Sequence, residues 1–361
     1  MNESRKDDHV RLAMEQNSRR RRAVHFDDVR FMHHPLAAVD VASVSVATSI
    51  DETQWDLPFF INGMTGGSDF TGQLNRSLAI AAADTGIAMA SGSMSAYFKN
   101  PACAESFTVL REENPHGFLM ANLSANATPE QAREAVDLID ADALQIHINP
   151  VQEIVMPEGD REFTHRRRAI ERIVGAVSVP VIVKEVGFGM SADTVLRLAR
   201  LGVRYVDVAG SGGTNFARIE NARRSGENFP LLDDWGHSAV ESLIDARGAA
   251  RDSGVGLLAS GGVRTPLDVV KALALGARAV GVAGSFLAIV RNDGPDALIE
   301  EIELWREQVQ AIMALLGAET VDALTSTDLL ITGEVRDFAD ARGIDMTRYA
   351  RRSASRHAGG E

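Results

Sequence analysis

Eight short apolar segments, separated by helical patterns, limit the folds that this chain can adopt. The segments cover residues 58–62, 86–90, 117–121, 143–148, 180–183, 205–209, 256–259 and 279–282. Helix-like stretches between them include residues 129–139, 191–202 and 265–276. Strands that are apolar on both faces and alternate with helices predict a parallel sheet covered by helices on its faces. Eight such units favour an α/β fold of the (β/α)8 or TIM barrel type.

The main alternative is a doubly wound open sheet that binds a dinucleotide. Such a sheet requires a Gly-x-Gly-x-x-Gly turn after its first strand, and none follows residues 58–62. We therefore predict an N-terminal arm over residues 1–57, a barrel over residues 58–324 and a C-terminal tail over residues 325–361. The arm has to cross the mouth of the barrel if its basic residues are to reach a ligand there.

Composition and charge exclude several classes of function. The formal net charge of −13 argues against nucleic acid as the main partner, because neutralising phosphates needs a basic face. The single cysteine, Cys103, excludes an intramolecular disulfide and a multi-cysteine metal site. No apolar run approaches membrane-spanning length, and the polar N-terminus lacks the apolar core of a signal peptide. We expect a soluble cytoplasmic protein.

Polar residues follow every predicted strand. The clearest case is "HINPVQEIVMPEGD" at residues 147–160, which begins inside an apolar run and then becomes strongly polar. The active site of a (β/α)8 barrel forms where the carboxyl ends of its strands meet the following loops. The same change after all eight strands therefore predicts a site at that end.

The turns after the last two strands predict a phosphate site. In (β/α)8 barrels these two loops and a helix N-terminus commonly hold a phosphate group. Here "SGGVRT" at residues 260–265 allows close backbone approach through Gly261 and Gly262, and Gly284 with Ser285 repeats the arrangement. A pair of ordinary tight turns is the alternative.

Several motifs together resemble one family, the type 2 isopentenyl diphosphate isomerases, which are FMN-dependent barrels that interconvert isopentenyl and dimethylallyl diphosphate. They occur in order along most of the chain as "RKDDHV" (5–10), "FINGMTGG" (60–67), "GS" (92–93), "HINPVQEIVMPEGDREF" (147–163), "VKEVGFGMS" (183–191), "GSGGTNFARIE" (210–220), "DWG" (234–236) and "GGVRTPLDV" (261–269). The combination of Asn-x-x-Gln-Glu with Pro-Glu-Gly-Asp is highly specific, whereas Gly-Gly-Val-Arg alone is common to many FMN barrels.

The resemblance implies a set of site residues. FMN would contact Met64, Thr65, Gly66, Ser93, Asn122, Lys184, Ser211, Thr214, Gly262, Val263, Arg264, Ala283 and Gly284. The substrate would be bound by Arg5, Lys6, His9, Asn149 and Gln152, Mg²⁺ would be held by Glu153, and Gln152 with His147 would serve catalysis. NADPH is implied as the reductant of the flavin, and an isoprenoid diphosphate as the small-molecule partner.

These roles also have a physical basis. A cation at the end of a strand, such as Lys184, can stabilise the negative charge that collects on a reduced flavin. Shifting a double bond requires a strong acid beside an unactivated alkene, and neither Gln152 nor His147 is an obvious one. Reduced FMN carries exchangeable protons at its ring nitrogens, and it would fill this role as the resemblance implies.

The chain departs from the family after "GS", where Met94 and Ser95 follow, and after "WG", where His237 follows. Other interpretations stay open for single residues. Glu153 could be an exposed carboxylate, and His147 could be a hydrogen-bonded core histidine. The run Arg19–Arg22 is most simply a solvated basic face, with a subunit contact as the next interpretation.

Three other functions use the same fold. A hydroxy-acid oxidase needs an active-site His in the loop after the sixth strand, and "GSGGTNFARIE" has none. An inosine monophosphate dehydrogenase needs a nucleophilic Cys in the loop after that strand, whereas Cys103 follows the second. A non-catalytic flavin-binding barrel could have lost Gln152 and Glu153, but both are present.

We also expect the arm and the long connection over residues 211–236 to be mobile without ligand. Formation of a homo-oligomer, a tetramer or an octamer, is expected to order them.

Overall fold

The computed structural model describes residues 7–13, 16, 25–224 and 229–353 of the chain. Within these residues, eight parallel strands close into a barrel. In chain order they are β4 (Phe59–Ile61), β5 (Met89–Ala90), β6 (Leu119–Ser124), β7 (Ala143–His147), β8 (Val181–Lys184), β9 (Tyr205–Asp207), β10 (Gly256–Ser260) and β11 (Ala279–Val282). Strands β11 and β4 pair to close the ring, with Gly281 opposite Phe60. The predicted (β/α)8 fold is confirmed.

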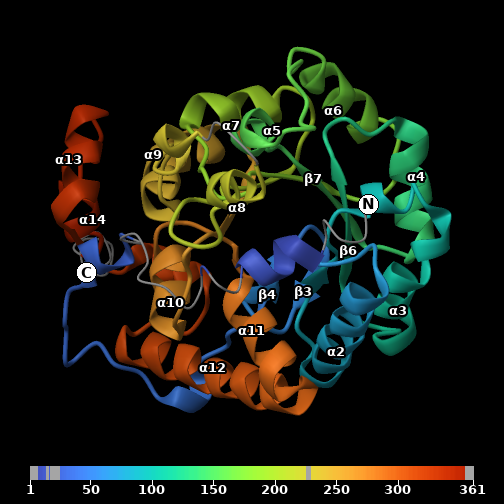
Figure 1. The fold of residues 1–361 in the computed structure, drawn as a ribbon. Helices are drawn as coiled ribbons and strands as arrows, with labels where there is room; N and C mark the ends of the chain where they lie inside the picture. The colour runs from blue at the N-terminus through green and yellow to red at the C-terminus, as the bar shows by residue number, and fades with distance from the viewer. Residues whose placement is uncertain (1–6, 14–15, 17–24, 225–228, 354–361) are drawn as a thin grey trace.

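Helices surround the barrel, and those between consecutive barrel strands return the chain from one strand to the next (Figure 1). They are α2 (Asp69–Thr85), α3 (Glu105–Glu113), α4 (Pro129–Leu138), α5 (Pro150–Val155), α6 (Arg166–Val174), α7 (Ala192–Ala199), α8 (Phe216–Arg223), α9 (Ala239–Ser253), α10 (Pro266–Ala274), α11 (Gly284–Asp293), α12 (Pro295–Leu315), α13 (Gly333–Ala341) and α14 (Thr347–Ala350). None of the described helices is long and apolar enough to cross a membrane.

Local sequence explains where many of these helices begin and end. Ser68, Thr128, Ser238 and Thr265 each form a capping box, in which the side chain accepts the third backbone N–H of the helix. Helices α2 and α9 end at glycines with left-handed backbone. These signals lie within a few residues of each boundary, so they can be seen in the sequence.

The N-terminal region reaches both ends of the barrel. Residues 7–13 are helical and lie over the mouth, at the carboxyl ends of the strands (Figure 1). Strands β2 (Thr48–Ile50) and β3 (Thr53–Trp55) form a hairpin, and Trp55 packs against Phe60 and Phe118 at ring distances of 5.7 and 4.9 Å. The hairpin therefore covers the opposite end of the barrel, where its apolar side chains join the lower interior layer.

The C-terminal region ties the N-terminal region to the barrel. Strand β1 (Val29–Phe31) pairs antiparallel with β12 (Leu329–Ile331), which precedes α13. Helices α13 and α14 lie at the periphery, with α13 beside α9 (Figure 1). The connection over residues 211–236, expected from the sequence to be a long loop, contains helix α8 and a short 3-10 helix over Pro230–Leu232.

Candidate active site

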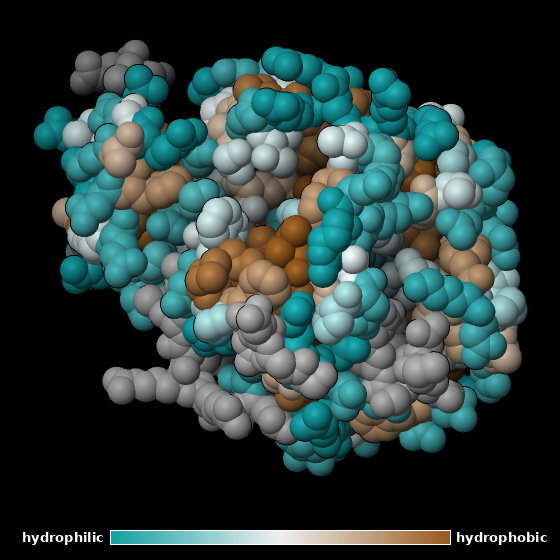
Figure 2. Space-filling view, turned by 45° about the horizontal axis from the view of Figure 1, so that its top comes forward, coloured by the Kyte–Doolittle hydropathy of each residue, from teal (hydrophilic) through white to brown (hydrophobic). Residues whose placement is uncertain are grey.

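A cavity of about 1020 Å³ opens at the carboxyl ends of the strands. Residues from every βα connection and from the helical residues 7–13 line it. Hydrophobic side chains are gathered near the centre of the face shown in Figure 2, and the periphery of this face is mostly hydrophilic. The volume is that of a cavity able to enclose a cofactor or a drug-sized ligand.

The floor of the cavity is a polar layer inside the barrel. Asp207 is fully buried, and its carboxylate accepts hydrogen bonds from Asn62 Nδ2 at 3.2 Å and from Ser260 Oγ at 2.8 and 2.9 Å. Across the barrel, Asn122 and Gln145 form a second buried pair at 2.9 Å. Each group is partnered, so this layer forms a rigid support for whatever binds above it.

One wall of the cavity is backbone. Gly262, Val263, Ala283, Gly284 and Ser285 line it, from the turns that follow the neighbouring strands β10 and β11. A Cβ atom at Gly261 would lie 1.9 Å from the carbonyl oxygen of Gly210, and the φ of Gly261 is +96°. Only glycine fits there, which is what a turn that brings backbone N–H groups to a phosphate requires.

The opposite wall carries the polar residues of α5 and α8. Gln152 Nε2 donates to Glu220 Oε1 at 2.9 Å, and His9 Nε2 lies 3.0 Å from the same oxygen. Glu220 is fully buried and also pairs with Arg223. Burial opposes ionisation, but His9, Gln152 and Arg223 together hold the pKa of Glu220 below its ordinary value. Glu220 is therefore a buried carboxylate that stays charged at neutral pH.

Glu153 is held next to this wall by two hydrogen bonds. Its Oε1 accepts from Asn149 Nδ2 at 3.1 Å and its Oε2 accepts from the backbone N–H of Asp160 at 2.7 Å. Arg161 donates to the carbonyls of Met156 and Gly159 and so stabilises the loop between α5 and α6. Among the described residues, Asn149 Oδ1 is buried without a hydrogen-bond partner, so this acceptor suits a donor on a ligand.

Lys184 and His147 occupy the ends of the neighbouring strands β8 and β7. Lys184 Nζ donates to the backbone carbonyl of Glu185 at 2.7 Å, and His147 Nδ1 lies 2.8 Å from Asn122 Oδ1. The Glu185 side chain turns away from the cavity and accepts the N–H groups of Val186 and Phe188, both at 2.6 Å. These two hydrogen bonds hold the loop beside Lys184. Burial raises the pKa of Glu185 to about 8 even though both hydrogen bonds favour the charged form.

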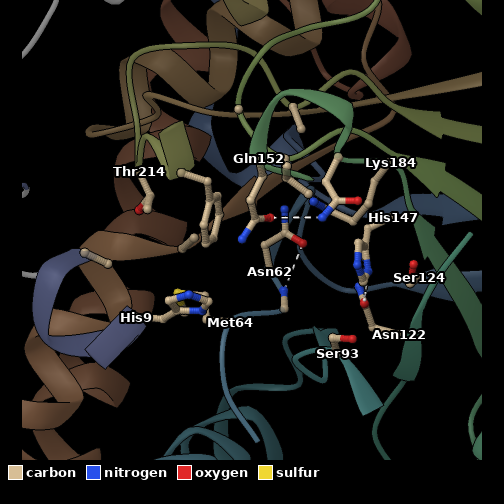
Figure 3. Close-up of a pocket in the computed structure, with 18 of the residues that line it drawn as sticks. His9, Asn62, Met64, Ser93, Asn122, Ser124, His147, Gln152, Lys184 and Thr214 are labelled. Atoms are coloured by element: carbon tan, nitrogen blue, oxygen red, sulfur yellow. Dashed lines mark hydrogen bonds between the residues drawn. The ribbon is translucent and has the colours of Figure 1, made fainter. Parts of the chain in front are cut away.

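Most of the residues that the sequence singled out line this one cavity (Figure 3). They are His9, Met64, Thr65, Ser93, Asn122, His147, Asn149, Gln152, Glu153, Lys184, Thr214, Gly262, Val263, Ala283 and Gly284. Arg5, Lys6 and the run Arg19–Arg22 lie outside the described residues.

Three expected cofactor contacts, Gly66, Ser211 and Arg264, do not line the cavity in this structure. A Cβ atom at Gly66 would meet the ring of Phe107, Ser211 bridges to Ser238, and Arg264 Nη2 donates to the carbonyl of Gly212. These contacts connect the three residues to the loops that form the cavity.

Sequence reasoning assigned no role to Glu220, Asn62 or Phe216, although all three belong to quoted motifs. Asn62 and Phe216 line the cavity, and Glu220 joins Gln152 to His9. The only signal for Glu220 was its place in "GSGGTNFARIE", because its contact with Gln152 joins residues 68 positions apart.

Comparison with known proteins agrees with this geometry. Residues 107–331 match the FMN-dependent dehydrogenase family. An isopentenyl-diphosphate delta-isomerase from Streptomyces sp. (strain CL190) is 54% identical over 97% of this chain and 96% of that protein. The isomerase of the same name from Staphylococcus aureus is 44% identical over 96% of this chain and 98% of that protein.

Solved structures share the fold at low sequence identity. The flavin-binding domain of baker's yeast flavocytochrome b2 superposes with a TM-score of 0.63 at 19% identity, over 87% of this chain and 77% of that one. A mandelate oxidase superposes with a TM-score of 0.62 at 17% identity, over 90% and 89% of the two chains.

Proposed function

The chain belongs to the isopentenyl-diphosphate delta-isomerase family and carries an FMN-dependent dehydrogenase domain, and we propose that it interconverts isopentenyl and dimethylallyl diphosphate with reduced FMN bound. The observation that carries the proposal is the cavity itself, which is lined by the glycine turns and by Gln152, and Gln152 is hydrogen-bonded to the buried Glu220. The mandelate oxidase and the flavocytochrome b2 domain share the fold at below 20% identity, whereas the two isomerases are 54% and 44% identical to this chain.

The cavity fits FMN. The backbone turns at Gly262 and Gly284 suit its terminal phosphate, and Lys184 would lie beside the part of the flavin that gains negative charge on reduction. When bound, reduced FMN would supply exchangeable protons at its ring nitrogens.

The protein would contribute position and charge to the isomerisation. Protonating an alkene places positive charge on carbon, and a fully buried, ionised Glu220 would stabilise that charge more strongly than water can. Gln152 is held at both ends of its amide, by Asn149 and by Glu220, and would present a fixed polar edge to the substrate. The apolar side chains of Val10, Met64 and Phe216 would exclude water from the reacting carbons.

Glu153 would bind a magnesium ion that carries the substrate diphosphate. The described residues contain no group of three or more His, Cys, Asp or Glu able to cage a metal. Mg²⁺ fits a site of a different kind, with one carboxylate, phosphate oxygens and waters. The substitution Glu153→Gln should raise the Mg²⁺ concentration needed for half-maximal rate, measured in a metal titration. An unchanged titration would remove this assignment.

The test of the proposed function is isomerisation by the purified protein. Protein reduced with NADPH should convert isopentenyl diphosphate to its isomer and consume far less than one equivalent of NADPH per product formed. Gln152→Ala should lose rate while keeping its flavin. Consumption of NADPH in step with product would instead identify an oxidoreductase.

We propose further that the protein acts in the cytoplasm as a homo-oligomer, a tetramer or an octamer. The proposed homo-oligomer is supported by three large apolar side chains that are exposed in the single chain, Leu36, Leu231 and Trp235. Light scattering of the holoprotein would measure the number of subunits.

A further inference from the structure

A chain of buried side chains inside the barrel ends at His147. Met120, Asn122, Gln145 and His147 lie on the adjacent strands β6 and β7, and Asn122 is the direct cross-strand neighbour of Gln145. Successive side chains of a strand point to opposite faces, so residues two apart share a face. All four therefore point into the barrel, in a column that rises from the apolar layer around Met120 to the cavity.

The hydrogen bonds of this column have a single direction. Gln145 Nε2 donates to Met120 Sδ at 3.7 Å, and Gln145 Oε1 accepts from Asn122 Nδ2 at 2.9 Å. The remaining end of the Asn122 amide, Oδ1, lies 2.8 Å from His147 Nδ1. Because a carbonyl oxygen only accepts, His147 Nδ1 must carry the hydrogen.

The opposite direction of these hydrogen bonds is unfavourable because Met120 cannot donate one. Turning both amides over would place Gln145 Oε1 against the thioether sulfur, which has no hydrogen to donate. Met120 and Gln145 are both fully buried, so water cannot replace the lost partner. The sulfur at the bottom of the column thus determines which end of Asn122 faces the histidine.

We propose that Met120 and Gln145 act as positioning residues that hold His147 with its hydrogen on Nδ1. Nε2 is then the ring nitrogen at which His147 accepts a hydrogen bond or a proton from the contents of the cavity. The inference builds on the proposed isomerisation and on the catalytic role that the family resemblance implies for His147, but the position of the hydrogen can be measured without turnover.

The experiment uses holoprotein containing histidine labelled with ¹⁵N at Nδ1 alone, studied by solid-state NMR. The His147 signal is identified by its absence from the His147→Gln variant. The native protein should give a protonated Nδ1. In Gln145→Leu, where Asn122 can present either end of its amide, an unprotonated Nδ1 signal should appear beside it. An unprotonated Nδ1 in the native protein, or an unchanged signal in Gln145→Leu, would overturn the proposal.

The hydrogen-bonded column from Met120 to His147 is called the relay below. Two further variants separate the effect of its hydrogen-bond direction from the effect of its packing. Met120→Leu removes the sulfur at nearly constant volume and should also produce the unprotonated signal, and a purely native signal would remove Met120 from the relay. Ile182→Val removes a methyl group beside Gln145, its direct cross-strand neighbour, without removing any hydrogen-bonding group, and its signal should stay native. A mixed signal in Ile182→Val would overturn the relay as the cause.

Turnover gives a second readout. If the two tautomers become equally populated in Gln145→Leu, kcat should fall to about half at unchanged flavin content, since only one tautomer is competent. A native protein with protonated Nδ1 but no isomerisation would contradict the proposed function and leave the relay intact.

Discussion

Glu220 is the charged residue on which the proposed chemistry most depends. It is fully buried, it contacts Gln152 and His9, and Arg223 balances its charge. Arg223 also pairs with Glu158 at 3.0 Å, but the Glu158 side chain is 45% exposed. The two carboxylates share one arginine, yet only Glu220 is shielded from water, so its field at the substrate should be much the stronger.

Glu220→Gln removes this charge at nearly constant shape. We expect kcat to fall by about 10²-fold, the scale of a lost charge-stabilising or acid–base group, with flavin content unchanged. Steady-state kinetics of the reduced enzyme measure the effect. Glu158→Gln is the matched control, and an equal loss of kcat there would show that the pairing with Arg223 matters and the burial of Glu220 does not.

The turn between β10 and α10 combines a helix cap with glycines that allow close backbone contact. Thr265 caps α10 and accepts from the Asp268 N–H, and Asp268 in turn accepts from the backbone N–H groups of Arg264 and Thr265. This box fixes where the helix begins, immediately after the glycines that line the cavity. The glycine conformation and the helix cap therefore form one unit.

Gly261→Ala should disrupt this unit. Its Cβ would overlap the Gly210 carbonyl oxygen at 1.9 Å, so the turn has to shift away from the phosphate position. We expect purified Gly261→Ala to contain little FMN, measured by absorbance after release of the flavin. Gly248→Ala is the control, because its Cβ meets nothing within 4 Å inside helix α9. It should keep its flavin and gain about 0.5–1 kcal/mol of stability, and full flavin content in Gly261→Ala would contradict the assignment of the turn.

The two terminal regions meet at His25. Its Nδ1 lies 3.0 Å from Ser238 Oγ and 3.6 Å from Glu241 on α9, and its Nε2 lies 3.1 Å from Glu334 on α13. The nearby Glu241 carboxylate raises the pKa of His25 above its ordinary value against the effect of burial. Burial opposes ionisation of Glu241, but His25 and Ser238 outweigh it and hold the pKa of Glu241 at about 2. The ion pair thus joins the N-terminal segment, the barrel and α13.

The pH dependence of stability should report this junction. A raised histidine pKa stabilises the fold fully below the unfolded value of 6.5, and the contribution disappears as the pH rises through the folded value. A lowered glutamate pKa stabilises above 4.5, and the contribution disappears as the pH falls toward 2. His25→Asn should therefore lower the free energy of unfolding most between pH 4.5 and 6.5.

The expected loss is about 1.5–3 kcal/mol, the contribution of a hydrogen bond to a charged group. Denaturant unfolding of native and variant proteins at several pH values measures it. A difference that is constant from pH 5 to pH 9 would show that His25 acts through packing alone.

The order of strands and helices, the capping residues and the glycine turns can be read from the sequence, because each depends on neighbours within a few positions. The alternation of apolar strands and helices was sufficient for the barrel, and the strand-end motifs placed the site at its carboxyl end. Residues such as Lys184 and Gly262 could be assigned because strand ends in a parallel barrel always meet there.

Which of these groups contact one another becomes visible only in the folded chain. Glu220 faces Gln152 because α8 folds back over the cavity, and His9 joins them from a helix far away in the chain. Gly66, Ser211 and Arg264 belong to the same motifs as cavity residues, yet they are not among the residues that line the cavity. The physical reason is that loop side chains are oriented by contacts across the barrel, and no local pattern encodes those contacts.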